Sequence, residues 1–98
     1  MTSVKVSPEF LDFIHHIRKD VIEAMFGSDP KMYHHIEIVE DGNGICFDVG
    51  LKLKLEDSGK LYDELKKELE GSESASLKYF RYDYIGTTAY FVIWHRKG

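Results

Sequence analysis

Side chains that could do acid–base or metal chemistry face one another in the first predicted β-hairpin. The stretch 41–44, Asp-Gly-Asn-Gly, is a strong turn signal between two segments with alternating apolar and polar residues. A four-residue loop fixes the register and places Glu37 directly opposite Asp48. His35 lies beside them on the same face, so His35, Glu37 and Asp48 form a candidate site, named here the acidic cluster.

Two opposed carboxylates destabilise a sheet unless something compensates for their repulsion. A shared proton, a cation or a metal ion could do so. The alternative is that both side chains reach into water and that Lys52, Lys54 or Arg81 offsets their charge. Because protein metal sites usually converge three or four ligands, we favour structural charges. A small enzyme or a metal-dependent site on the acidic cluster is kept as an alternative.

The histidine doublets at 15–16 and 34–35 do not suit a single metal ion, because adjacent side chains diverge on a helix and oppose on a strand. His16 and Asp20 are spaced i, i+4, with Glu23 further along the same side. These three residues could form half of a metal site, but the HExxH spacing is absent. An ordinary polar helix face is the favoured interpretation.

Nucleophilic catalysis finds little support in the chain. Cys46 lies in a predicted strand, without a helix N-terminus to activate its thiol, and the G-x-S-x-G motif is absent. The stretch 57–60, Asp-Ser-Gly-Lys, lacks the glycine spacing of a phosphate-binding loop, and we interpret Ser58 as a helix cap. We therefore name no catalytic residue, no metal ligand and no cofactor.

A set of aromatic residues is predicted on the sheet face that points away from the helices. Tyrosine, tryptophan and arginine are the types enriched at binding hot spots, and an exposed patch of this kind usually has a partner. The alternative is that cross-strand aromatic pairs simply stabilise an exposed sheet. The candidate binding residues are Tyr33, Tyr79, Arg81, Tyr90, Val92 and Trp94.

The first element that must support this face is a helix predicted over 8–26. Ser7 is a suitable N-cap and Pro8 suits the first helical position. Apolar residues recur at helical spacing from Phe10 to Met25, and Gly27 can end the helix.

Two hairpins are predicted, with strands at 32–40 and 45–55 and at 77–85 and 88–96. Gly-Thr at 86–87 suits a two-residue turn.

The registers of these hairpins separate the two faces of the sheet. Tyr79 should lie directly opposite Trp94 on the outward face, and His34 should point inward, opposite Leu51. The residues expected to face the helices from the second hairpin are Phe80, Tyr82, Tyr84, Ala89, Phe91 and Ile93.

A second helix over 58–70 completes an α-β-β-α-β-β order. We predict an α+β two-layer sandwich, with a four-stranded antiparallel sheet and two helices on one face. An additional strand at 3–6 would give the element order of ferredoxin-like folds, by analogy only.

Composition fits one soluble domain over 1–98, with 43% hydrophobic and 31% charged residues and a net charge of -4. The single cysteine fits a reducing compartment. No signal peptide is visible at 1–5, and the longest apolar run, 89–94, is too short for a membrane span. We expect a cytoplasmic protein, in a host cell if it is viral.

These observations predict a non-enzymatic binding module that uses its aromatic sheet face to hold a protein partner or a second copy of itself, as a homodimer. Membrane association is not expected, and nucleic acid fits poorly with the acidic balance. A small inhibitor or accessory protein of phage or mobile-element type is a further alternative.

Overall fold

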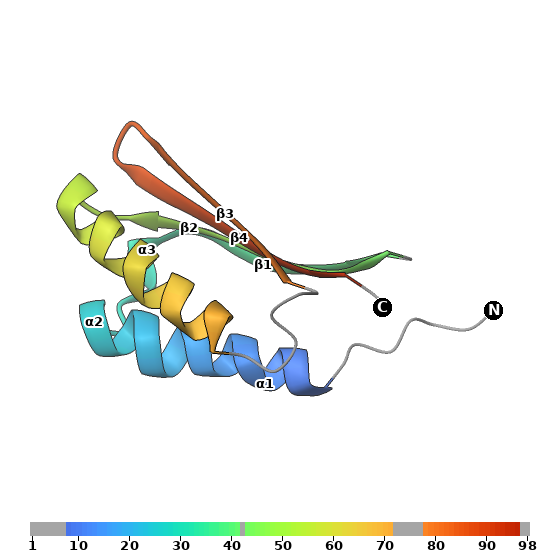
Figure 1. Ribbon diagram of the computed structural model, residues 1–98. Helices are drawn as coiled ribbons and strands as arrows, with labels where there is room; N and C mark the ends of the chain where they lie inside the picture. Colours follow the sequence, from blue (N-terminus) through green and yellow to red (C-terminus); the bar gives the residue numbers. More distant parts are fainter. Residues whose placement is uncertain (1–7, 42, 72–77, 97–98) are drawn as a thin grey trace.

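The structure is a computed structural model that describes residues 8–41, 43–71 and 78–96. It confirms the two-layer α+β sandwich, with both helices on the same side of one four-stranded antiparallel sheet. Figure 1 shows the helices beneath the sheet and no element above it. The other face of the sheet is therefore uncovered by any described residue.

The first helix runs without a break over the predicted span, but its middle is wound more widely. It consists of α1 (Pro8–His16), a π-helical segment η1 (Ile17–Glu23) and α2 (Ala24–Phe26). Gly27 ends it with a φ of 91°, a backbone conformation that glycine adopts without strain.

The π-helical segment changes which residues face the sheet after it. A π turn contains one residue more than an α turn, so the phase of the following residues shifts by one position. Ile22 is consequently buried and Phe26 packs against the core, whereas Ala24 and Met25 are exposed. The prediction that apolar spacing continues to Met25 is therefore wrong.

The four strands form the two predicted hairpins, but the second strand ends at Lys52 and not at Leu55, because Leu55 begins the next helix. A 3₁₀ turn, η2 (Pro30–Met32), leads into the first strand. The order of the strands across the sheet is β1-β2-β4-β3, so β2 and β4 are central and β1 and β3 are the edges. The strands are β1 (Tyr33–Asp41), β2 (Gly44–Lys52), β3 (Lys78–Ile85) and β4 (Thr88–Arg96).

The predicted registers hold in both hairpins over most of their length. Glu37 lies opposite Asp48, and Tyr79 lies opposite Trp94. The register shifts by one residue between Tyr33 and His35, which is a β-bulge. His34 is the extra residue and is exposed, so its predicted inward position opposite Leu51 is wrong.

The second helix, α3 (Leu55–Glu70), begins three residues earlier than predicted. Ser58 is not its cap: the Ser58 backbone N–H donates to the Lys54 carbonyl, as in a helix interior. The buried Ser58 hydroxyl donates to the Leu55 carbonyl and lies 2.6 Å from the Tyr82 hydroxyl. Ser58 thus links α3 to β3 instead of starting the helix.

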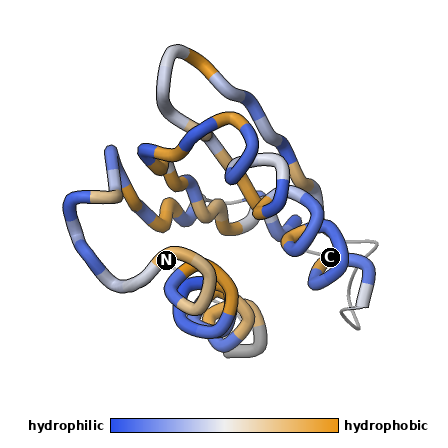
Figure 2. The backbone as a smooth tube through the Cα atoms, turned by 90° about the vertical axis from the view of Figure 1, so that its left-hand side faces the viewer, coloured by the Kyte–Doolittle hydropathy of each residue, from blue (hydrophilic) through white to orange (hydrophobic). Residues whose placement is uncertain are grey.

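The hydrophobic core fills the space between the two layers. Its members come from the inward stripe of each helix and from alternate positions of the central strands, an alternation visible along the tube in Figure 2. The buried residues include Phe10, Ile14, Ile17, Val21, Phe47, Val49, Leu61, Leu65, Phe91 and Ile93.

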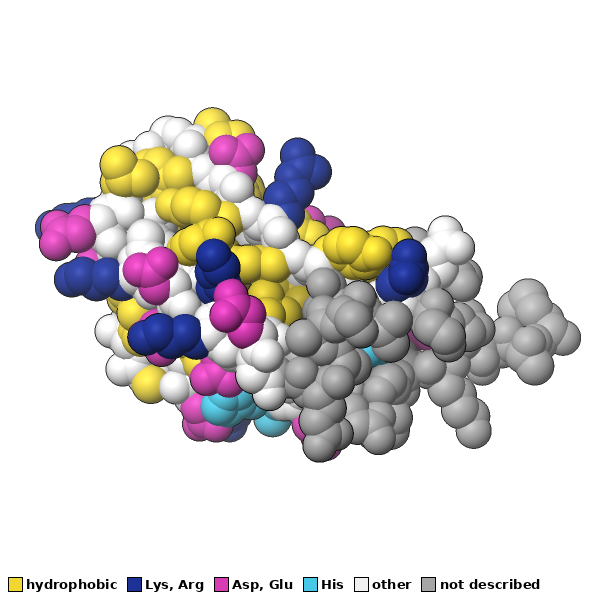
Figure 3. Space-filling model, in the orientation of Figure 1, with side chains coloured by type: hydrophobic (Ala, Val, Ile, Leu, Met, Phe, Trp, Pro, Cys, Tyr) yellow, Lys and Arg dark blue, Asp and Glu magenta, His cyan; other side chains and the backbone are white. Residues whose placement is uncertain are grey.

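The inward faces of the two edge strands are covered unequally. On β3, Phe80 stacks with Tyr62 of α3 at a centroid distance of 5.3 Å, and the Tyr82 ring packs against Tyr62 at 5.1 Å with a tilt of 43°. Figure 3 shows hydrophobic side chains reaching the surface between β3 and α3. On β1, by contrast, Ile36 and Ile38 remain 37% and 46% exposed.

The segment 3–6, predicted as a possible strand, lies outside the described residues. In the ferredoxin-like order, a strand at 3–6 would count as the first, β1 as the second and β2 as the third, and the third strand lies between the first two. In the described sheet, β2 instead lies between β1 and β4, so its order differs from the ferredoxin-like one. Within the described chain, the helices are too short or too polar to cross a bilayer.

Candidate functional site

The candidate site is the outward face of the sheet, the face without helices. Strand registers align its side chains in three rows that run across all four strands from β1 to β3. In the order β1, β2, β4 and β3, the apolar row consists of Val39, Cys46, Trp94 and Tyr79. The charged row consists of Glu37, Asp48, Val92 and Arg81. The histidine row consists of His35, Gly50, Tyr90 and Asp83.

The apolar row presents a tryptophan and a tyrosine side by side. The ring centroids of Tyr79 and Trp94 lie 5.5 Å apart, with 32° between the ring planes. Tyr79 and Val39 are each 46% exposed. The guanidinium carbon of Arg96 lies 5.8 Å from the centroid of the Tyr79 ring. This end of the face therefore offers a half-buried apolar surface bordered by a cation.

The charged row contains the two opposed carboxylates, and one of them is compensated. The His35 Nε2 lies 2.9 Å from the Asp48 Oδ1, so a hydrogen bond joins the two strands. Glu37 is exposed, and on the far side of the row Arg81 is exposed on β3. Within the described residues, neither Glu37 nor Arg81 has an ion-pair partner.

The histidine row depends on Gly50. A Cβ built on Gly50 would lie 2.8 Å from the His35 Nδ1, so the imidazole occupies space that any other residue would fill. The Tyr90 ring packs against it from the neighbouring strand, with a centroid distance of 5.8 Å. His34, the bulge residue, meets the edge of Tyr90 at 6.0 Å. The His35 side chain is thereby held over the sheet and within reach of Asp48.

A depression of about 350 Å³ lies over the charged and histidine rows. It is open to solvent along the sheet surface, and both acidic and basic groups border it. Its lining includes His35, Asp48, Arg81, Asp83, Tyr90 and Val92.

The acidic cluster can transfer protons but is not arranged around a metal ion. The His35 nitrogen that faces the carboxylates is already bonded to Asp48, while Glu37 is exposed at the sheet edge. Among the residues that the structure describes, no group of three or more His, Cys, Asp or Glu side chains could hold a metal ion. A histidine–aspartate pair can act in acid–base chemistry.

Five of the six predicted binding residues lie on the outward face: Tyr79, Arg81, Tyr90, Val92 and Trp94. Tyr33 does not, because the bulge at His34 turns it to the face of its partner Leu51, where it packs against the core. Burial raises the pKa of the Tyr33 phenol, and the nearby Arg18 guanidinium acts in the opposite direction. The placement of Tyr33 on the binding face is corrected accordingly.

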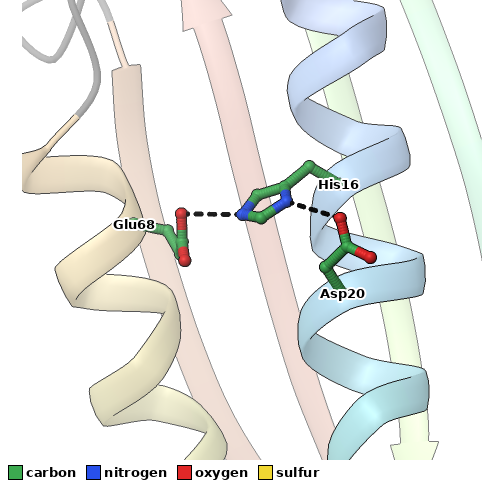
Figure 4. Close-up of polar contacts among 3 residues, drawn as sticks. All are labelled: His16, Asp20 and Glu68. Carbon is green, nitrogen blue, oxygen red and sulfur yellow. Dashed lines mark hydrogen bonds and ion pairs between the residues drawn. The ribbon is translucent and has the colours of Figure 1, made fainter.

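His16 of the first helix contacts Asp20, at the predicted i, i+4 spacing, and also a carboxylate of α3. The His16 Nδ1 lies 2.9 Å from the Asp20 Oδ2, and the Nε2 lies 3.0 Å from the Glu68 Oε2 of α3 (Figure 4). The second carboxylate that contacts His16 is therefore that of Glu68, and not that of Glu23. The hydrogen bond to Asp20 has the largest influence and raises the pKa of His16; burial, the next largest, lowers it, and the hydrogen bond to Glu68 raises it again. Both ring nitrogens are engaged, so His16 acts as a link between the helices.

Two features of the outward face were missing from the residues predicted to bind. Val39 extends the apolar row onto β1, a position that the hairpin register already implied. The space at Gly50 for the His35 ring carried no sequence signal, because it depends on how a side chain of the neighbouring strand turns. The chain matches no protein-family model, and comparison with curated proteins and with solved structures gives no match.

Proposed function

We propose that this protein is a small non-enzymatic binding module whose outward sheet face holds a protein partner. The observation that carries the proposal is the pair of Trp94 and Tyr79 at the β3 end of the apolar row, on the face that no described element covers, with Tyr79 46% exposed. Contiguous apolar surface that faces water is unfavourable, and a partner that covers it relieves this cost.

The composition of the face also resembles that of protein interfaces. Such interfaces combine a hydrophobic centre with a polar rim, and tyrosine, tryptophan and arginine contribute most of their binding energy. Here Trp94 and Tyr79 are flanked by Arg81 on one side and by Arg96 on the other.

The charges of the face argue against nucleic acid as the partner. Glu37, Asp48 and Asp83 lie on the same face as Arg81 and Arg96, so the surface does not offer a continuous track for phosphates. The chain as a whole is acidic, with a net charge of -4. We also propose a reducing, cytoplasmic setting, because the chain has a single cysteine, Cys46, and therefore cannot form a disulfide within itself.

The proposal is tested by comparing two double variants in affinity capture. Tyr79→Ala with Trp94→Ala empties the apolar row. Leu11→Ala with Leu55→Ala is the matched control, because these leucines are also exposed, at 42% and 62%, but lie on the helices. Circular dichroism verifies that both variants retain their helices.

If the proposal is correct, associated protein is lost only from the variant without Tyr79 and Trp94. If the wild type and both variants capture the same amount of associated protein, the apolar row is not the binding surface. Equal loss from both variants would point to general destabilisation and would also contradict the proposal.

A second candidate function is acid–base catalysis, which the His35–Asp48 hydrogen bond at the edge of the depression favours. It predicts that the wild type turns over a probe ester or phosphoester and that His35→Gln abolishes the turnover. His34→Gln, at the neighbouring bulge residue, is the control. Absence of turnover by the wild type with every probe would eliminate this candidate.

A further inference from the structure

We propose that the partner held by the outward face is a second copy of this chain, an inference that rests on the proposed function. The argument comes from the three rows. Two sheets can pack face to face around a two-fold axis that runs parallel to the strands, between β2 and β4. This axis places β1 of one copy over β3 of the other and β2 over β4, while each row stays over the same row.

In the apolar row, this arrangement puts apolar residues over apolar residues. Val39 would lie over the second copy's Tyr79, and Cys46 over the second copy's Trp94. All four residues of the row are therefore matched, and the surface that faces water in one copy is buried by the other.

In the charged row, the same axis brings the two unpaired charges together. Glu37 on β1 would lie over the second copy's Arg81 on β3, and the two-fold symmetry repeats the contact. Within one copy these residues stand at opposite ends of the row, with Asp48 and Val92 between them. Only a second molecule can bring their charges into contact, which makes the face complementary to itself.

The histidine row follows the same rule. His35 would lie over the second copy's Asp83, and Tyr90 over the second copy's Gly50, the one position of the row without a side chain. An imidazole that can hydrogen-bond is thus placed over a carboxylate, and a large ring over the smallest residue.

An axis that crosses the strands does not give this agreement when it is centred on the charged row or between the charged and histidine rows. Centred on the charged row, it would place Arg81 over the second copy's Arg81 and Glu37 over the second copy's Glu37, which repel. Centred between the charged and histidine rows, it would place Trp94 over the second copy's Thr88 and leave the apolar row unmatched.

The area of the face is sufficient for a stable pair. Strands about 4.8 Å apart, with a rise of about 3.3 Å per residue, give a four-stranded face of about 600 Å² per copy. Two copies would bury roughly 1,200 Å², which reaches the lower end of specific interfaces.

The test is a charge exchange followed by sedimentation equilibrium. Arg81→Glu and Glu37→Arg should each weaken self-association by about tenfold or more, because each homodimer then carries two repulsive contacts. An equimolar mixture of the two variants should associate as the wild type does, since every contact in the mixed dimer again joins opposite charges. Lys66→Glu and Glu70→Arg, exposed positions on α3, are the matched controls and should dimerise normally.

Three results would overturn this inference: a monomeric wild type, a mixture that associates no better than its components, or a dimer that persists in Arg81→Glu. The last would place the contact elsewhere, such as the open edge of β1 where Ile36 and Ile38 are exposed. A monomeric wild type that still loses a captured protein on removal of Tyr79 and Trp94 would overturn the second copy alone and leave the proposed function standing.

Discussion

The rings of Trp94 and Tyr79 lie next to each other on the sheet face that no described element covers, with centroids 5.5 Å apart, while their chain neighbours Ile93 and Phe80 pack in the core. This arrangement determines how much a substitution on either face of the sheet lowers the free energy of unfolding. An exposed ring contributes little to folding, whereas a buried ring contributes the free energy of its transfer from water and of the cavity that it fills.

We therefore expect Tyr79→Ala to lower the free energy of unfolding by about 1 kcal/mol or less, through loss of the aromatic pair. Phe91→Ala, in the buried position of the neighbouring strand, should cost about 3–5 kcal/mol. Urea denaturation monitored by circular dichroism measures both. Similar costs for the two variants would contradict the assignment of faces.

A second prediction concerns Gly50, whose missing side chain leaves space for the His35 ring. Gly50→Ala adds a Cβ that would lie 2.8 Å from the His35 Nδ1, so the imidazole must move away from Asp48. We expect a loss of about 1–3 kcal/mol in the free energy of unfolding.

Gly59→Ala is the matched control for this substitution. Gly59 lies inside α3, and an added Cβ would meet nothing within 4 Å. Alanine there should stabilise the protein by about 0.5–1 kcal/mol, because it favours the helix. Stabilisation by both substitutions would show that the His35 ring does not occupy the space over Gly50.

His16 predicts a pH dependence of stability. Its pKa is raised from 6.5 in the folded state, so protonated His16 is favoured by folding. The resulting stabilisation is complete below the pKa of the unfolded chain and is lost as the pH rises through the folded pKa. It should remain below about 1 kcal/mol, because the side chains of His16, Asp20 and Glu68 are 41%, 69% and 34% exposed.

The measurement compares His16→Gln with the wild type in denaturant at pH 5.5 and at pH 8.5. The variant should be less stable at the lower pH and nearly equal at the higher pH. His15→Gln, at the exposed neighbour, should show no such difference. A larger deficit of His16→Gln at the higher pH would contradict the linkage.

The environment of the Tyr33 hydroxyl leads to a prediction for the free energy of unfolding when that hydroxyl is removed. Its oxygen is buried without a well-formed hydrogen bond in the described structure, as is the Arg18 Nε, although the Arg18 guanidinium is near enough to act on the pKa of the Tyr33 phenol. Tyr33→Phe should therefore leave the free energy of unfolding unchanged or raise it by up to about 1 kcal/mol. Because burial raises the pKa of Tyr33 above 10.0, the wild type should also lose stability relative to Tyr33→Phe in strongly alkaline solution. A clear loss of stability in Tyr33→Phe at neutral pH would contradict a buried hydroxyl without a well-formed hydrogen bond.

Local patterns in the sequence predicted the layers, both hairpin registers and the opposition of Tyr79 and Trp94. They did so because alternation and turn chemistry act within each hairpin. The pairing of β2 with β4 depends on contacts between hairpins, which no local pattern specifies.

Prediction from the sequence also failed where one extra residue changes which side chains of a strand or helix face the core. The bulge at His34 turned Tyr33 inward, and the π-helical segment turned Met25 outward. Each is one extra residue accommodated by packing against the rest of the fold, and neither has a distinctive residue type. The space at Gly50 was unpredictable for a different reason, because it depends on the orientation of the His35 side chain on the neighbouring strand.

The single tryptophan tests the central claim most directly, because Trp94 lies in the apolar row and reports whether that row is covered. Acrylamide quenching of its fluorescence should weaken as the protein concentration rises, as a second copy covers the ring, and Arg81→Glu should remain quenched over the same range. Quenching of the wild type that is independent of concentration would show that the outward face stays open to solvent, and would contradict self-association through it.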